Sequence, residues 1–428
     1  MDTIFALSTA RGKAGVAVVR VSGPAAAAAC RILAGAVPAP RRAVLRTLRD
    51  GEVVLDRGLV LFFPGPGSAT GEDVAEFHLH GSPAVIAAVL RVLAAQRGFR
   101  AADAGEFTQR ALASGRMTLT EVEGLGDLLE AETEAQRRQA MRGFGGALLA
   151  RGEGWRARLM RAAALIEATI DFVDEDVPVD VWPEVRALVT AVLVECRAEM
   201  ALFPAAERLR DGFEVAIVGA PNTGKSTLLN RLAGREAAIT SEFAGTTRDV
   251  IEVRMDIGGL PVTFIDTAGL RETADPVEAM GIARARGRMA AADLRIVLSL
   301  DGALPEGFES RGDDIILAAK ADDDPGAGAG VSGRTGAGVD HLLARIRTLL
   351  SERVAAPAIL TRTRHQSAVG AAAGLLESVL FALEDGTVAP EVVAEDIRAA
   401  TRALEALIGR VDVESVLGEI FSRFCIGK

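Results

Sequence analysis

The segment at residues 213–232, FEVAIVGAPNTGKSTLLNRL, constrains the fold of this chain more than any other stretch. An apolar run leads into the spacing G-x-x-x-x-G-K-S at residues 219–226, and a helical pattern follows. This order of strand, loop and helix is the context in which a phosphate-binding P-loop occurs. Its glycines let backbone N–H groups face phosphate oxygens, and the helix N-terminus adds positive partial charge. The segment therefore predicts a mainly parallel α/β domain that binds a nucleotide.

Two side chains of this loop are predicted to contact the phosphates and the metal ion. Lys225 supplies an ammonium group for the β- and γ-phosphates, and the Ser226 hydroxyl can ligate Mg²⁺. We expect the nucleotide to be contacted here by Asn222, Thr223, Gly224, Lys225, Ser226 and Thr227.

Two further stretches extend the same site. In AGTTRDV, a hydroxyl of Thr246 or Thr247 can reach Mg²⁺ and sense the γ-phosphate. PVTFIDTAGL is an apolar strand that ends in Asp266, which can hold Mg²⁺ indirectly, and the Gly269 amide can contact the γ-phosphate. The expected contacts also include Ser241, Thr267 and Ala268.

The base-recognition stretch, DIILAAKADD, favours guanine over adenine. It places Lys320 and Asp322 after a strand, and a carboxylate there can accept hydrogen bonds from both N1–H and the N2 amino group of guanine. Adenine offers no such pair of donors. A loop over the base is expected from Ser332, Gly333 and Arg334.

One position departs from the usual base motif, Asn-Lys-x-Asp. Ala319 stands in the place of the asparagine. Its missing amide predicts weaker guanine-nucleotide binding or a weaker tie to the P-loop.

The position that often carries a water-orienting glutamine is Leu270, so hydrolysis needs other groups. Asn222 could supply one oxygen of a monovalent-cation site, with backbone carbonyls of Ser241 and Phe243 supplying others. Glu272 and Glu278 are the candidates for positioning water, and a solvated acidic loop is the alternative interpretation of both.

The chain divides into four segments by pattern. Residues 1–118 alternate short apolar runs with Gly/Pro turns and carry one helical stretch, PAVIAAVLRVLAAQ, which is typical of an α+β domain. Residues 119–212 are helical, residues 213–353 alternate strands and helices, and residues 354–428 are helical again. We therefore expect an α/β domain inserted into a discontinuous helical domain.

Bulk properties favour a soluble cytoplasmic protein. The N-terminus lacks the basic and apolar regions of a signal peptide, and no uncharged apolar stretch of membrane-spanning length is expected. Three scattered cysteines argue against a disulfide framework. The net charge of −10 disfavours non-specific nucleic-acid binding.

Several stretches of specific sequence, inside and outside the nucleotide motifs, are distributed over the whole chain. They include GVAVVRVSG, FPGPGSATGEDVAEFHLHG, AGEFTQRA, EATIDFVDED, DTAGLRE and the terminal FCIGK. With the domain layout, they make the chain resemble the MnmE (TrmE) family of tRNA-modification GTPases over essentially its whole length.

The resemblance implies an N-terminal domain that is similar to folate-dependent aminomethyltransferase folds. That domain would form a homodimer and bind 5-formyltetrahydrofolate or a related tetrahydrofolate. By motif position, the folate site would be lined by Arg20, Glu76, Arg116 and Lys428, and Arg116 stands where relatives have lysine.

The resemblance also implies a reaction and a partner. A separate FAD-containing protein would join the dimer in a heterotetramer and build a carboxymethylaminomethyl-type group at C5 of the wobble uridine of certain tRNAs. Potassium-dependent pairing of two G domains would accelerate GTP hydrolysis, and Glu278 rather than Glu272 would assist the water. The implied ligands are Ser226 and Thr247 for Mg²⁺, and Asn222, Ser241, Phe243 and Thr246 for K⁺.

Cys425 has two interpretations. It is either a reactive thiol near the transferred carbon or a small residue that fills a tight site, and a lone near-terminal cysteine is more often inert. His78 and His80 share one face of a strand, and without a third ligand they are expected to be surface or pocket residues rather than a metal site.

Three alternatives remain open on the sequence. They are a GTPase binding switch of the ribosome-assembly type, a P-loop ATPase, and a GTPase that only assembles its partner. Asp322 contradicts the ATPase, and the Ala/Leu/Glu-rich C-terminal segment lacks the basic character of an appended RNA-binding domain.

Overall fold

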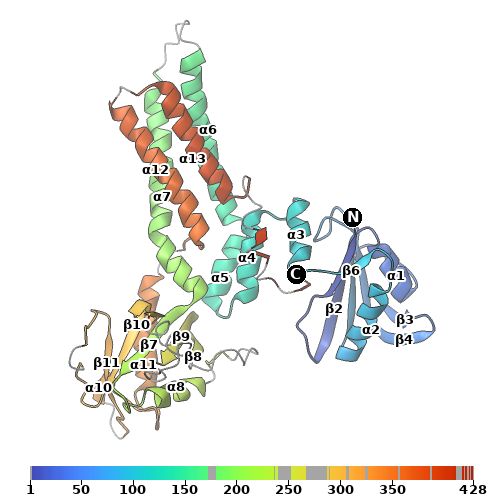
Figure 1. Ribbon diagram of the computed structural model, residues 1–428, viewed down its shortest axis with the longest axis horizontal. Coiled ribbons are helices and arrows are strands. Elements are labelled where there is room, and N and C mark those ends of the chain that lie inside the picture. Colours follow the sequence, from blue (N-terminus) through green and yellow to red (C-terminus); the bar gives the residue numbers. More distant parts are fainter. Residues whose placement is uncertain are drawn as a thin grey trace, which may run out of the picture. The chain divides into compact units, whose positions relative to one another are not determined.

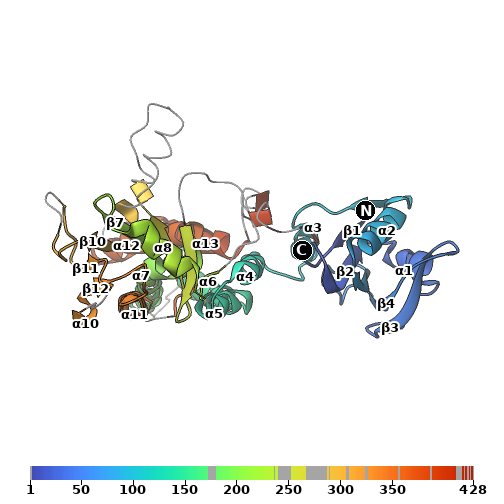
Figure 2. The ribbon, with the colours of Figure 1, turned by 90° about the horizontal axis from the view of Figure 1, so that it is seen from below.

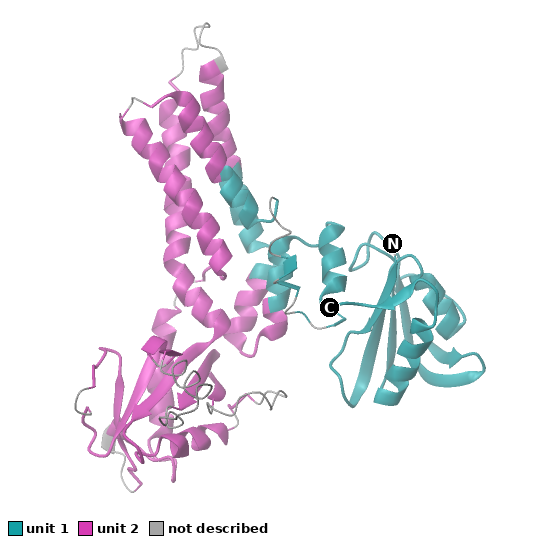
Figure 3. Cartoon of the chain, viewed as in Figure 1, with its two compact units in different colours: residues 1–126, 143–156, 401–428 teal, residues 127–142, 157–400 magenta. Residues whose placement is uncertain are grey.

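The computed structural model describes residues 2–171, 180–235, 237–239, 252–266, 287–288, 290–304, 308–322, 326–354, 357–385, 388–410, 417–418, 420–421, 424 and 426–427. The chain divides into two compact units (Figure 3). Unit 1 comprises residues 1–126, 143–156 and 401–428, and unit 2 comprises residues 127–142 and 157–400.

Unit 1 is built on a six-stranded sheet with the order β3-β4-β5-β2-β1-β6 (Figure 1). Neighbouring strands are antiparallel except for β1 and β6, which are parallel. The strands are β1 (Thr3–Leu7), β2 (Ala14–Ser22), β3 (Val44–Asp50), β4 (Val53–Phe63), β5 (Val74–Gly81) and β6 (Phe99–Ala101).

Alternation along the strands buries one face of this sheet beneath helices α1 (Ala26–Ala34) and α2 (Pro83–Ala94). Phe77 and Leu79, two residues apart on β5, belong to that core. The expectation of a single helix in this region is wrong, because α1 and α3 (Glu106–Ala113) are also present. Helix α1 was missed although its buried residues, Ala26, Ala29, Cys30 and Leu33, follow a helical spacing.

The C-terminal residues of the chain belong to unit 1. Phe421 and Phe424 pack with Leu119 and Val122 of α4 (Leu119–Glu130) in one hydrophobic cluster. Ile426 forms an antiparallel β-bridge with Ala104.

Unit 2 contains helices from both sides of the nucleotide motifs. They are α5 (Glu134–Phe144), α6 (Ala147–Asp171), α7 (Trp182–Asp211), α12 (Thr363–Asp385) and α13 (Pro390–Leu407), of which α5, α6 and α13 extend into the residues of unit 1. Helix α5 is short and the others are long. Helix α12 packs against α7.

Helix α12 is apolar over much of its length, although Glu377 interrupts it. Helix α12 is long and apolar enough to cross a membrane by length and composition, with a mean hydropathy of 1.4 over its most apolar window. One side of the helix is packed: Val369, Ala373 and Leu376 are buried, and α12 contacts α7.

The sheet of unit 2 has the order β12-β11-β10-β7-β9-β8, of which Figure 2 labels β7, β10, β11 and β12. Its strands are parallel except for β8, which is antiparallel to β9, so the predicted mainly parallel sheet is confirmed. The strands are β7 (Phe213–Gly219), β8 (Glu252–Ile257), β9 (Leu260–Asp266), β10 (Leu294–Ser299), β11 (Ile315–Ala319) and β12 (Gly330–Val331), and the helices packed with them include α8 (Lys225–Ala233), α10 (Gly326–Ala329) and α11 (Val339–Arg353).

The central strand β7 explains why this sheet is a rigid base for the site. Val215 and Ile217 enter one hydrophobic core, while Ala216 and Val218 enter another on the opposite face. A strand buried on both faces is what a parallel sheet covered by helices requires. The P-loop therefore begins at the end of a strand that is packed on both faces.

Candidate nucleotide-binding site

The P-loop connects β7 to α8 with the geometry that its glycines permit. Gly219 and Gly224 have φ angles of 152° and 99°, and a Cβ on Gly219 would lie 2.3 Å from the Leu298 carbonyl oxygen. Asn222 also has a positive φ of 64°, which asparagine tolerates better than most residues. The two glycine positions in the motif are thus required by the backbone.

Lys225 is folded back into this loop. Its Nζ donates to the carbonyl oxygens of Gly219 and Ala220, each at 2.9 Å, and the residue is buried. Burial lowers the pKa of Lys225, and the nearby Asp266 carboxylate opposes that effect. The ammonium group is held inside the loop, where it can exchange its carbonyl partners for phosphate oxygens.

Ser226 and Asp266 bring the predicted Mg²⁺ site together. The Ser226 hydroxyl donates to Oδ2 of Asp266 at 2.6 Å, although the two residues are 40 positions apart in the sequence. A hydroxyl beside a carboxylate offers the hard oxygen atoms that Mg²⁺ prefers. These residues fit the ion: Ser226 would ligate it directly, and Asp266 would hold it through bound water.

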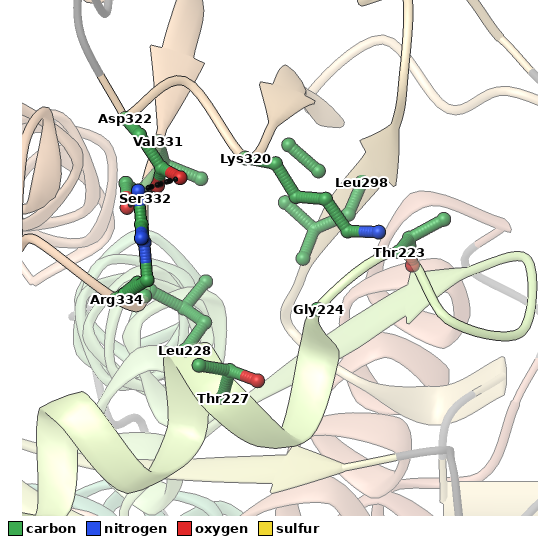
Figure 4. A pocket seen from close by; sticks show the side chains of 12 residues that line it. Thr223, Gly224, Thr227, Leu228, Leu298, Lys320, Asp322, Val331, Ser332 and Arg334 are labelled. Atoms are coloured by element: carbon green, nitrogen blue, oxygen red, sulfur yellow. Dashed lines mark hydrogen bonds and ion pairs between the residues drawn. The ribbon is translucent and has the colours of Figure 1, made fainter.

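A cavity of about 220 Å³ lies beyond the start of α8 (Figure 4). Figure 4 shows Lys320 pointing toward Thr223 on one side and Arg334 near Asp322 on the other. Its lining residues are Thr223, Gly224, Thr227, Leu228, Leu298, Ala319, Lys320, Asp322, Val331, Ser332, Gly333 and Arg334. The structure therefore brings the predicted base-recognition residues and part of the P-loop into one pocket.

Asp322 is held by two neighbours from the following loop. Its Oδ1 accepts a hydrogen bond from Ser332 Oγ at 2.5 Å, and Arg334 Nη2 lies 2.6 Å from its Oδ2. The Ser332 hydrogen bond, followed by the Arg334 guanidinium, lowers the pKa of Asp322. The carboxylate is thus ionised at neutral pH, as an acceptor of two guanine N–H groups must be.

Three apolar residues of this pocket were missed by the sequence prediction. They are Leu228, Leu298 and Val331. Leu298 lies near the carboxyl end of β10, beside β7. Since ligands bind at the carboxyl ends of strands in such sheets, the end of a third parallel strand was the clue to it.

Several predicted site residues lie outside the described residues, and nothing is concluded about them from the structure. They are Ser241, Phe243, Thr246, Thr247, Thr267, Ala268, Gly269, Glu272, Glu278, Cys425 and Lys428.

Two of the predicted folate residues meet in unit 1. Arg20 on β2 is in register with Glu76 on β5, and Arg20 Nε donates to Glu76 Oε1 at 3.0 Å. The Arg20 guanidinium also lies 5.7 Å from the ring centroid of Phe107. Phe107 itself is buried in the core, so the Arg20–Glu76 pair lies over a packed aromatic side chain.

Arg116 is placed by a different part of unit 1. Its Nε donates to the Ser68 carbonyl oxygen at 3.1 Å, which ties it to the loop between β4 and β5. No contact between Arg116 and the Arg20–Glu76 pair is recorded among the described residues.

The end of the chain reaches the same sheet. A Cβ on Gly427 would lie 2.2 Å from the Leu7 carbonyl oxygen, so the backbone packs directly on the end of β1. The adjacent Ala6 is paired in register with Arg20. The C-terminal segment therefore lies near the strand position that carries Arg20.

The two histidines on β5 have acidic neighbours. His78 Nε2 is 3.4 Å from Glu76, and His80 Nδ1 is 2.7 Å from Asp56. Burial raises the pKa of Asp56, but the hydrogen bonds from His80 outweigh it and the net shift is downward. In the described part of the chain, no group of three His, Cys, Asp or Glu side chains is placed to hold a metal ion.

The two cysteines that the structure describes are buried. Burial raises the pKa of Cys30 to about 11 and that of Cys196 to about 12, where neighbouring Glu195 adds to the effect. Both are therefore protonated and unreactive at neutral pH.

The fold and the site together define the class of the protein. A parallel sheet, a P-loop with its lysine and serine, a carboxylate at the end of β9 and a base-recognition carboxylate after β11 are the parts of a P-loop GTPase-like domain.

Comparison with known proteins gives the family. Residues 3–116 match the family described as "GTP-binding protein TrmE N-terminus", and residues 119–425 match "MnmE helical domain". The chain therefore belongs to the MnmE/TrmE family of tRNA modification GTPases.

Relatives match along the entire length. The "tRNA modification GTPase MnmE" of Cereibacter sphaeroides (strain ATCC 17029 / ATH 2.4.9) is 59% identical over 428 residues, covering 100% of both chains. The protein of the same name from Roseobacter denitrificans (strain ATCC 33942 / OCh 114) is 56% identical over 432 residues, again covering 100% of both. Among solved structures, Aquifex aeolicus Era bound to GDP and AlF4⁻ is 27% identical over 32% of this chain and 56% of that one, with a TM-score of 0.24.

Proposed function

We propose that this protein binds GTP with Mg²⁺ in the pocket between β7, α8 and β11 and hydrolyses it in the course of tRNA modification. The observation that carries the proposal is the position of the buried Lys225 and the Ser226–Asp266 pair at the start of α8. Their chain neighbours Gly224 and Thr227 line the pocket that also holds Asp322. The names of the full-length relatives support the same activity.

The chain's own residues account for binding and orientation. Lys225 would leave its two carbonyl partners for the β- and γ-phosphates, and the N–H groups at the start of α8 would face the same oxygens. Asp322 would accept the N1–H and N2–H groups of guanine. Bound Mg²⁺ would neutralise charge that develops on the phosphates.

Asn222 in the P-loop is the described residue that we propose as a K⁺ ligand. The remaining proposed K⁺ ligands are Ser241, Phe243 and Thr246, Thr247 would join Ser226 on Mg²⁺, and Glu278 would orient the water. A bound monovalent cation would supply positive charge near the phosphates. Leu270 stands where other GTPases often have a water-orienting glutamine, and its apolar side chain cannot take that role.

We further propose that unit 1 binds a tetrahydrofolate. The Arg20–Glu76 pair beside Phe107 and the docking of Gly427 on the end of β1 support a site there, with Arg116 and Lys428 as further contacts. The site would serve a homodimer that acts with an FAD-containing partner on C5 of the wobble uridine, in the cytoplasm where tRNA is found.

The direct test of the nucleotide proposal is GTP hydrolysis by the purified protein in matched KCl and NaCl buffers. We expect hydrolysis with a large potassium-specific stimulation that is lost in Asn222→Ala. Equal rates in both salts would remove the cation assignment and favour a binding switch. No hydrolysis in either salt, with and without Mg²⁺, would contradict the GTPase proposal.

The folate proposal has its own test. Titration with 5-formyltetrahydrofolate should give saturable binding that Arg20→Ala and Glu76→Ala each weaken, while GTP binding is retained. Cys425→Ser separates the two interpretations of the thiol. Lost wobble-uridine modification with intact GTP and folate binding would indicate a chemical role, and retained modification would indicate packing.

A further inference from the structure

Helix α5 begins at a fixed point because its first turn is capped by its own sequence. Thr133 precedes the helix, and its Oγ1 accepts a hydrogen bond from the Gln136 amide at 3.4 Å. In return, Gln136 Oε1 accepts the Thr133 amide at 3.1 Å. This reciprocal pair is a capping box, which fixes the direction in which the chain enters the helix.

The same first turn contacts the β8–β9 hairpin of the nucleotide-binding sheet. The Ala135 amide donates to the Gly259 carbonyl oxygen at 3.2 Å, and Arg254 Nη1 lies 3.5 Å from Glu132 Oε1. The Ala135 side chain also packs against the hydrophobic core of that sheet. A helix outside the sheet is therefore attached to the tip of one hairpin.

The hairpin tip is a tight turn with little freedom. Ile257 pairs with Leu260, and the two residues between them, Gly258 and Gly259, have φ angles of 63° and 93°. The twist of such a two-residue turn matches the twist of the strands that it joins. A shift of the Gly259 carbonyl would therefore shift both β8 and β9.

The other side of α5 is braced by α7. Gln136 Nε2 donates to the Arg210 carbonyl oxygen at 2.9 Å, and the buried Gln139 donates to the Ala206 carbonyl oxygen at 3.0 Å. Both acceptors lie in the last turns of α7, immediately before β7. One short helix thus connects the end of α7 with the hairpin.

Strand β9 links this contact to the proposed Mg²⁺ site. Its first residue follows Gly259, and its last residue is Asp266, which accepts the Ser226 hydroxyl at 2.6 Å. Seven residues of strand span roughly 20 Å, and the strand is held between β7 and β8. If the hairpin moved along its own axis, β9 would therefore move Asp266 with it.

We propose that the first turn of α5 is a positioning element for Asp266: through the Ala135–Gly259 and Glu132–Arg254 contacts it sets the place of β9, and so couples Mg²⁺–nucleotide binding to the helices of unit 2. This inference rests on the proposed function, since it presumes that Asp266 serves Mg²⁺. The coupling is reciprocal: if α5 affects Mg²⁺ binding, bound Mg²⁺–GTP must affect α5 by the same factor.

A charge exchange tests the first direction. Arg254→Glu and Glu132→Arg each place like charges opposite one another, and the double variant restores an opposite pair. We expect each single variant to raise the Mg²⁺ concentration for half-maximal GTP hydrolysis roughly two- to fivefold. An effect of this size is expected because an exposed ion pair contributes little to stability. The double variant should return it towards the wild-type value, which a merely destabilised single variant would not predict.

Hydrogen exchange tests the second direction without relying on activity. In the wild type, GTP with Mg²⁺ should slow amide exchange in residues 133–144. Ala135→Pro removes the N–H that reaches Gly259, at a first-turn position where proline is tolerated. It should abolish the nucleotide-dependent slowing, whereas the control Glu134→Pro keeps the Ala135 amide and should retain it.

The outcomes distinguish this inference from the proposed function. Unchanged Mg²⁺ dependence in both charge variants, or exchange in residues 133–144 that is the same with and without nucleotide, would overturn the coupling alone. Absence of GTP binding and hydrolysis in the wild type would instead overturn the function on which it rests.

Discussion

Arg334 Nη2 lies 2.6 Å from Oδ2 of Asp322, the carboxylate that we propose as the guanine acceptor. The arginine side chain is 74% exposed, while Ser332, which donates to the other oxygen, is fully buried. The two partners of Asp322 therefore differ: Ser332 is part of the packed loop, and Arg334 is a surface cation that would compete with guanine for one oxygen.

Removal of that competitor should speed nucleotide binding. We expect Arg334→Gln to raise the association rate of a fluorescent GTP analogue roughly two- to fivefold, because an exposed ion pair contributes at most about 1 kcal/mol. Added salt should accelerate binding to the wild type but not to the variant, since it screens the pair. Arg353→Gln, which breaks the exposed pair with Asp313, is the control. Slower association in Arg334→Gln would mean that the arginine contacts the nucleotide favourably.

Ala319 lines the same pocket and is 7% exposed. We expect Ala319→Asn to tighten GDP binding by roughly fivefold, because one added hydrogen bond contributes about 1 kcal/mol. Ala319→Leu adds similar bulk without an amide and should not tighten binding. Equal dissociation constants for the wild type and Ala319→Asn would remove the role assigned to the missing amide.

Gly333 brings the base loop against the start of α8. A Cβ there would lie 2.6 Å from the Leu228 amide nitrogen and 2.7 Å from the Thr227 carbonyl carbon. Because backbone cannot yield as a flexible side chain does, Gly333→Ala should destabilise the folded state by about 1–3 kcal/mol and weaken GTP binding. Thermal unfolding and nucleotide titration measure the two effects. Gly312→Ala, at a position where φ is not positive and an added Cβ would meet no atom within 4 Å, is the control for the loss of a glycine without crowding.

The buried Glu106 makes part of unit 1 sensitive to acid. Burial raises its pKa, but hydrogen bonds from Arg100, the Asp103 amide and Arg110 outweigh it, and the net pKa is lowered. A carboxylate with a depressed folded pKa stabilises the fold above its unfolded pKa of about 4.3, and that contribution is lost as the pH falls through the folded value.

We therefore expect amide exchange in α3 to be faster in Glu106→Gln than in the wild type at pH 7, and the difference to shrink towards pH 3. Comparison of both proteins at each pH cancels the intrinsic pH dependence of exchange. A difference that stays constant from pH 7 to pH 3 would show that ionisation of Glu106 is not the cause.

Local patterns determined much of the nucleotide domain. The P-loop could be predicted because its glycines, lysine and serine are adjacent in sequence and their roles are properties of one strand–loop–helix unit. Asp266 and Asp322 could be predicted because each follows an apolar strand, and the carboxyl ends of parallel strands meet at one edge. Helix α1 was not predicted, although its buried positions 26, 29, 30 and 33 have helical spacing; its packed residues are mostly alanine and cysteine, which stand out less in a sequence than the valines and leucines of α2.

By itself, the sequence determined the class of the nucleotide site, the residue types in it and the family of the chain, since these depend on short motifs and their order. Only the tertiary structure decided which contacts those residues make. Three such contacts are the hydrogen bond and ion pair of Ser332 and Arg334 with Asp322, the close approach of Gly333 to α8, and the attachment of α5 to the β8–β9 hairpin. They join separate segments of the chain, and their distances are fixed to within a few tenths of an ångström. Such distances follow from packing of the whole unit, which no local pattern encodes.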